Sequence, residues 1–115
     1  MELSVHVEQG AGHVVAAATG DIDIATSGTF RDTALAALEV GPVDLVLDLS
    51  SVTFIDSTGL SVLVLMRRET DERHRRLALV AGRRVRAILK IAGLADVFVV
   101  HPTIDSALGD VDDLA

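Results

Sequence analysis

The chain of 115 residues has no cysteine, tryptophan or tyrosine, and it has only three phenylalanines. Without cysteine, disulfides, thiol catalysis and zinc–thiolate sites are excluded. Scarce aromatic rings argue against a stacking platform for single-stranded nucleic acid or sugars. No run reaches the roughly 18 apolar residues of a membrane span. The first residues, MELSVHVEQG, lack the regions of a signal peptide. We therefore expect a cytoplasmic protein with no membrane association.

Charge is unevenly distributed along the chain. The net charge is −7, but residues 67–90 hold nine of the ten basic residues and sum to +6, which leaves −13 for the rest. Such a basic segment could bind nucleic acid. Its arginines are interrupted by Glu69, Asp71 and Glu72 and by apolar residues, a pattern more typical of solvated helix faces. The four histidines show no metal-ligand spacing. We expect no nucleic acid, metal or cofactor.

Hydrophobic periodicity predicts one α/β domain over residues 1–115. A mostly parallel or mixed sheet with an N-terminal antiparallel edge hairpin and about four helices is expected, because strands alternate with helices after the first pair. The predicted elements are strands 3–8 and 13–19, a helix capped by Thr26 or Ser27, strand 43–49, helix 60–72, strand 77–81, helix 83–92, strand 97–100 and a short helix capped by Thr103 or Asp105.

The segment FIDSTGLSVLVLM, residues 54–66, is the main functional candidate. It follows the central strand, and functional loops gather beyond the carboxyl ends of parallel strands. The four residues DSTG predict a helix start, in which Asp56 or Ser57 accepts backbone N–H bonds and Gly59 permits close packing. Residues 20–23 are expected nearby.

Three catalytic interpretations compete with a simple helix start. A hydrolase elbow needs G-x-S-x-G, and Ser57, Asp96 and His101 follow the chain order of that fold, but Ile55 replaces the first glycine. An aspartic protease needs Asp-Thr/Ser-Gly, which the extra residue here breaks. A receiver domain would use Asp48 as phosphoacceptor. It also needs an acidic pair after the first strand and a Lys-Pro after the last, and this chain has neither. We expect no enzymatic activity.

A regulated hydroxyl fits this position. A phosphate on Ser57 would meet the positive end of a helix dipole and would add about −1.5 to −2 charges beside Asp56, near Asp21 and Asp23. The helix that follows is apolar on both sides. One face, with Leu60, Leu63 and Val64, suffices for burial. The other would be covered by a third layer or by a second copy of the chain, or would bind a partner, which is the interpretation that we carry forward. That expected partner face comprises Ser61, Val62, Leu65 and Met66.

Three segments resemble the STAS domain family, specifically bacterial anti-sigma factor antagonists. They are TGDIDIATS, VDLVLDLSSVTFIDSTGLSVLV and RVRAILKIAGLADVFVVHPTIDSAL, in that order over almost the whole chain. The resemblance implies that Ser57 is the phosphoacceptor, with Thr58 as its neighbour and Gly59 at the helix start. It also implies that Asp23 is the family's acidic residue near the site. Many members have glycine where this chain has Ser61.

The resemblance also implies a partner switch. The unphosphorylated antagonist would bind an anti-sigma factor that is also a serine kinase, and so release a sigma factor. Phosphorylation of Ser57 would weaken the complex, and a PP2C-type phosphatase would restore it. The alternative is a non-switching STAS interaction subunit of a stress-signalling or lipid-transport complex. We expect a monomer or weak dimer.

Overall fold

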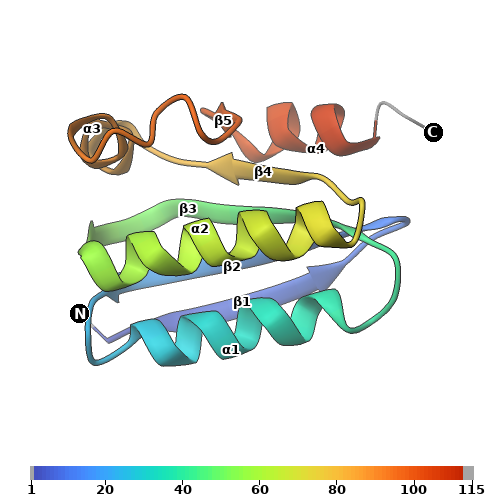
Figure 1. Cartoon of the computed structure of the whole chain (residues 1–115), viewed down its shortest axis with the longest axis horizontal. Helices are drawn as coiled ribbons and strands as arrows, with labels where there is room; N and C mark the ends of the chain where they lie inside the picture. Colours follow the sequence, from blue (N-terminus) through green and yellow to red (C-terminus); the bar gives the residue numbers. More distant parts are fainter. Residues whose placement is uncertain (1, 113–115) are drawn as a thin grey trace.

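The computed structural model describes residues 2–112. Over that range, helices and strands alternate after an initial pair of strands, in the order that the sequence predicts (Figure 1). The elements are β1 (Ser4–Gln9), β2 (His13–Ile22), α1 (Ser27–Leu38), β3 (Asp44–Ile55), α2 (Ser57–Glu72), β4 (Leu77–Val80), α3 (Arg83–Ile91), β5 (Val100–His101) and α4 (Ile104–Asp112).

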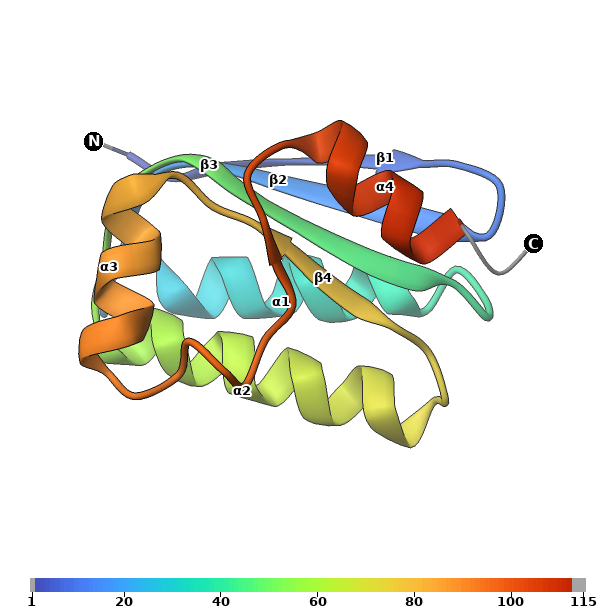
Figure 2. The same ribbon diagram turned by 90° about the horizontal axis from the view of Figure 1, so that it is seen from above.

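The strands form one five-stranded sheet in the order β1-β2-β3-β4-β5. β1 is antiparallel to β2, and every other neighbouring pair is parallel. This confirms the predicted α/β class and the antiparallel edge hairpin. Helices α1 and α2 cover one face, α4 lies on the other, and α3 stands at one end of the sheet (Figures 1 and 2). Parallel crossovers therefore bring the starts of α1 and α2 to the same end.

Most of the core lies between the sheet and α1, α2 and α3. The central strand shows why: Leu45, Leu47 and Leu49 face these helices and are fully buried, whereas Val46 faces the smaller cluster beneath α4. Burying each such side chain stabilises the fold by about 1.5–3 kcal/mol. A strand buried on both faces needs a nearly continuous apolar run, which is what residues 43–49 provide.

The central strand is longer than predicted and continues to Ile55. Its pairing with β2 shifts twice, between Ala17 and Thr19 and between Gly20 and Asp21, and β3 has one extra residue at each shift. Bulges of this kind re-aim side chains. As a result, Val52 and Ile55 are both buried while Thr53 and Phe54 are both exposed. Residues 50–55, whose polar composition predicts a loop, therefore remain part of the sheet.

The last strand is shorter than predicted. Residues 97–100 were expected to form it, but the regular strand covers only Val100 and His101. Leu79 N–H donates to the carbonyl of Val99 (3.0 Å), so the pairing begins before the strand does. Phe98 is buried and Val99 is 54% exposed, so the alternation of inward and outward side chains also begins before the regular strand. The following helix starts as expected, since Thr103 Oγ1 accepts the N–H of Ser106 at 3.2 Å.

The start of the chain passes close to the end of β2. Gly20 has a φ of +110°, and a β-carbon at this position would lie 2.5 Å from the backbone oxygen of Glu2. Only glycine combines that backbone conformation with so close an approach. The first described residues therefore lie beside the same end of the sheet as the start of α2 (Figure 1).

Candidate functional site

The start of α2 is held by Asp56, which occupies the N-cap position. Its Oδ1 accepts the N–H of Thr58 (2.8 Å) and of Gly59 (3.2 Å), and also the Thr58 hydroxyl. The Thr58 hydroxyl, together with these N–H groups, holds the pKa of the Asp56 carboxyl below its ordinary value. The helix begins at Ser57, three residues earlier than predicted. The DSTG segment is therefore a capped helix start.

Gly59 fixes how closely that helix start approaches the sheet. A β-carbon here would lie 2.6 Å from Ile55 Cγ1 and 2.7 Å from Ile22 Cγ2. Both isoleucines are buried at the ends of paired strands. The backbone of Asp56 is tied to the same place, because its N–H donates to the carbonyl of Ile22 (3.0 Å). The first turn of α2 thus rests directly on the ends of β2 and β3.

Ser57 is the first residue of the helix, and its side chain is exposed. Within residues 2–112 its hydroxyl makes no hydrogen bond, whereas the neighbouring hydroxyls are engaged. Thr58 Oγ1 donates to Asp56, and Ser61 Oγ donates to the carbonyl of Ser57 at 2.9 Å. Of the hydroxyls at this helix start, that of Ser57 is the one presented to an approaching molecule.

Asp21 and Asp23 lie at the same end, and both carboxylates accept hydrogen bonds: Asp23 within its own loop, and Asp21 from Thr53 on β3. Asp23 Oδ1 accepts the N–H of Ala25 (3.0 Å) and of Thr26 (3.2 Å), which closes the loop before α1. Thr26 occupies the predicted cap position, yet its hydroxyl donates to the carbonyl of Asp21 instead of capping the helix. The Thr53 hydroxyl donates to Asp21, which lowers the pKa of that carboxyl.

The expected partner face of α2 is wrong for two of its residues. Val62 and Met66 are buried (6% and 0% exposed), together with Gly59, Leu63 and Thr70. The close approach of Gly59 sets the rotation of the helix, so the residues in phase with it point inward. Ser61 is exposed and Leu65 is half-buried, as a surface role for these two requires.

The outward face of α2 instead contributes to a shallow groove of about 350 Å³. It begins about one turn after Ser57, and Leu94, three residues beyond the end of α3, closes it. The lining residues are Leu60, Ser61, Val64, Leu65, Arg68 and Leu94. Sequence reasoning had placed Leu60 and Val64 in the core and had missed Leu94.

Two exposed apolar side chains flank the start of α2. Ile24, in the loop after β2, is 81% exposed, and Phe54, near the end of β3, is 48% exposed. Both stand in short stretches that mix polar and apolar residues, DIDIATS and SSVTFID, so the sequence alone does not single them out. Exposed apolar residues beside a polar site mark interaction surfaces.

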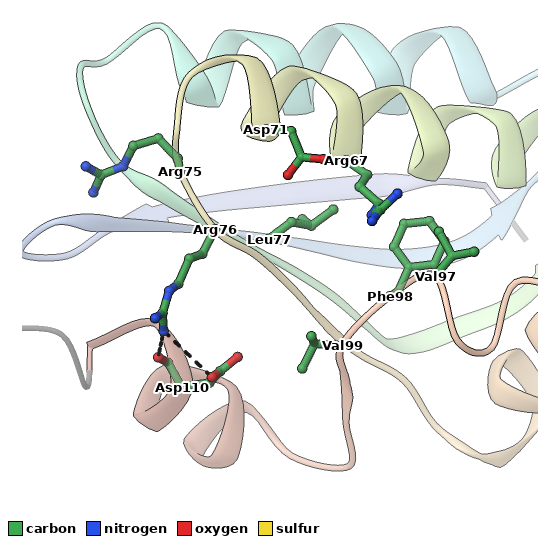
Figure 3. A pocket seen from close by; sticks show the side chains of 9 residues that line it. All are labelled: Arg67, Asp71, Arg75, Arg76, Leu77, Val97, Phe98, Val99 and Asp110. Carbon is green, nitrogen blue, oxygen red and sulfur yellow. Dashed lines mark hydrogen bonds and ion pairs between the residues drawn. The ribbon is translucent and has the colours of Figure 1, made fainter.

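A second hollow, of about 360 Å³, lies near the other end of α2 and is structural in character. Figure 3 shows Arg76 reaching α4, where it donates to the carbonyl of Asp110 (2.8 Å) and lies 3.9 Å from its carboxylate. Arg75 points away from the hollow, and its Nε lies 3.2 Å from the carboxylate of Asp44. These arginines fix the turn before β4.

Residues 2–112 contain no group of three His, Asp or Glu side chains able to hold a metal ion. Within the same range, none of the helices combines the length and apolarity that a membrane crossing requires.

Comparison with known proteins supplies the family context. Residues 4–107 match the sequence profile of the STAS domain. The anti-sigma-F factor antagonist RsfA of Mycobacterium tuberculosis is 35% identical over 98 residues, which cover 83% of this chain and 77% of that protein. The crystal structure of an anti-sigma factor antagonist from Mycobacterium paratuberculosis superposes with a TM-score of 0.89 at 31% identity, covering 97% and 96% of the two chains.

A more distant structure shares the fold. The anti-sigma factor antagonist SpoIIAA in its unphosphorylated form gives a TM-score of 0.80 at 21% identity, over 97% of this chain and 99% of that one. The five-stranded sheet with its antiparallel first pair is therefore common to proteins that share little sequence.

Proposed function

Since this chain belongs to the STAS domain family, we propose that it is an anti-sigma factor antagonist, a binding protein that acts by sequestering an anti-sigma factor. In the finer form of this proposal, the partner is also a serine kinase. It phosphorylates Ser57 and thereby ends the complex, and a PP2C-type phosphatase reverses the modification. Two relatives above 30% identity bear the name of antagonist. The observation that carries the proposal is the exposed, unengaged hydroxyl of Ser57 on a capped helix start.

The surroundings of Ser57 support a switch that acts on the partner. A phosphate adds about −1.5 to −2 charges next to the Asp56 carboxylate. The helix dipole offsets part of the repulsion, but Asp56 already uses the N–H groups of Thr58 and Gly59. Those two N–H groups are therefore not free to bind the added phosphate. Its main effect falls on whatever surface lies against this end of the molecule.

We place the partner surface on the outward side of α2. It comprises the groove that starts beside Ser61 and the exposed side chains of Ile24 and Phe54. An apolar surface next to a modifiable hydroxyl gives both affinity and control, because burying the apolar area favours the complex while a phosphate at its rim opposes it.

The direct test is to map the phosphate. The anti-sigma factor is first identified by pull-down with wild-type protein against Ser57→Asp, and the purified partner is then incubated with the chain and ATP. We expect modification of Ser57 alone, because the hydroxyls of Thr58 and Ser61 are engaged. Ser57→Ala should bind the partner and stay unmodified.

Ser57→Asp should bind the partner at least about tenfold more weakly while its Tm moves by no more than about 2 °C, because the dipole and the Asp56 charge act in opposite directions. Phosphate on Thr58 or Ser61 with Ser57 intact would contradict the assignment. A chain that binds its partner and is never modified would support the non-switching interaction subunit instead.

A further inference from the structure

Helix α3 presents a cationic surface that no carboxylate among the described residues neutralises. Its sequence, RRVRAILKI, contains no acidic residue. The cationic side chains are all exposed: Arg83, Arg84, Arg86 and Lys90. In the part of the chain that the structure describes, none of these four forms an ion pair. Of the six other basic side chains, Arg31, Arg73, Arg75 and Arg76 each lie within 4 Å of a carboxylate, and Arg67 and Arg68 on α2 form no ion pair within the same range.

The contrast is informative because the chain is acidic overall, at −7. A merely solvated helix face usually alternates its charges, so that acids three or four residues apart stabilise the cations. Here the acids lie elsewhere on the molecule. An uncompensated cationic helix on an acidic protein favours an acidic partner surface.

The position of α3 joins this cationic surface to the start of α2. Val85 and Leu89 bury the inner side of the helix, and the helix stands at the same end of the molecule as the start of α2 (Figures 1 and 2). Arg84 Nη1 donates to the carbonyl of Thr53 (3.2 Å), on the strand that leads to Ser57. The chain leaving α3 supplies Leu94 to the groove on α2. The two surfaces are therefore continuous.

One exposed apolar side chain narrows the class of partner. Ile91 follows Lys90 and is 87% exposed. A nucleic-acid backbone would make no use of it. A lipid surface would need several large apolar residues, and the others on this helix lie in the core (Val85 and Leu89) or pack against it (Ile88). A protein segment that combines carboxylates with apolar residues satisfies both features.

We propose that α3 docks an acidic segment of the anti-sigma factor, an inference that rests on the proposed function and specifies the chemistry of its partner. The segment would lie beside Ser57, so a phosphate there would repel it directly. Both the attraction to α3 and this repulsion are exposed charge interactions, which salt screens with a Debye length of about 10 Å at 0.1 M. Affinity and its loss on phosphorylation should therefore both decrease with salt.

The test compares two charge reversals of equal size. Arg86 is exposed and its side chain makes no hydrogen bond among residues 2–112, and glutamate near the start of a helix suits the dipole, so Arg86→Glu should fold. Arg31→Glu on α1 is the matched control, because α2 separates it from α3 (Figure 1). Affinity for the purified anti-sigma factor is measured by calorimetry at about 50 mM and about 300 mM salt.

We expect Arg86→Glu to bind about tenfold more weakly at low salt, with the difference narrowing at high salt, and Arg31→Glu to stay within about twofold of wild type. Equal affinity of the two variants would overturn this inference and leave the proposed function intact. Loss of binding to a duplex DNA probe in Arg86→Glu, with unchanged affinity for the anti-sigma factor, would overturn it in favour of nucleic acid. A wild-type chain that binds no anti-sigma factor would overturn both proposals.

Discussion

Replacing Gly59 by alanine tests how tightly the start of α2 is wedged against the sheet. The new β-carbon would lie 2.6 Å from Ile55 Cγ1 and 2.7 Å from Ile22 Cγ2. Carbon atoms in ordinary contact are about 3.5–4.0 Å apart, so the helix start or the two isoleucines must move by about 1 Å. Neither isoleucine has a free direction, because both are buried among the core residues.

The expected cost follows from two opposing effects. Overpacking a well-filled core costs about 1–3 kcal/mol, and exchanging glycine for alanine within a helix returns up to about 1 kcal/mol. We expect Gly59→Ala to lose about 1–2 kcal/mol of unfolding free energy, which lowers Tm by roughly 3–10 °C for a domain of this size. Thermal and urea unfolding followed by circular dichroism measure both quantities.

The chain offers a matched control in Gly109, a helical glycine of α4. Among residues 2–112, no heavy atom other than those of its chain neighbours and of the helix backbone lies within 4 Å of the position of its missing β-carbon. Gly109→Ala should therefore raise Tm by a few degrees, because only the helix-propensity gain remains. If the Gly59→Ala protein is as stable as Gly109→Ala, the close packing of Gly59 against the sheet is refuted. Such a result would show that the first turn of α2 can move away from the sheet at no cost.

Two further predictions concern the same helix. The carboxyl of Asp56 has a folded-state pKa below its ordinary value of 3.8, so its stabilisation is present above that value and is lost as the pH falls through the lowered one. Urea unfolding should show Asp56→Asn less stable than wild type at neutral pH, with the gap closing under strong acid; a constant gap would contradict the capping role. Met66→Glu should lower the free energy of unfolding by about 3–5 kcal/mol, because it buries an unpaired charge. Val64→Glu, on the outward face, should melt within about 2 °C of wild type. Equal melting temperatures of the two variants would show that Met66 does not lie in the core.

Most of the fold could be predicted because each element has a clear period. The alternation in the hairpin, the apolar run of β3 and the helix stops are local signals. Each depends only on residues that are a few positions apart in the sequence. The end of β3 could not be predicted in the same way. Its polar residues read as a loop, and the two bulges that keep Val52 and Ile55 inward depend on pairing with β2, which is a long-range property.

The rotation of α2 was mispredicted for a related reason. Six apolar residues stand within residues 60–66, so the run itself carries little information about which side faces the core. Two residues outside it resolve the ambiguity. Gly59 must face the sheet because only it permits the close approach, and Thr70 can be buried because its hydroxyl donates to the carbonyl of Met66 (3.0 Å). Residues in phase with both are the ones that pack inward.

The passage of Glu2 over Gly20 has a practical consequence for how this protein is handled. Residues joined ahead of Glu2 would emerge at the end of the molecule that carries the start of α2, whereas α4 ends at the opposite side (Figure 2). An affinity tag or a sensor-chip linkage at the N-terminal side would crowd the surface under study. Attachment beyond α4 keeps that surface open, so binding experiments on this chain belong with the C-terminal side anchored.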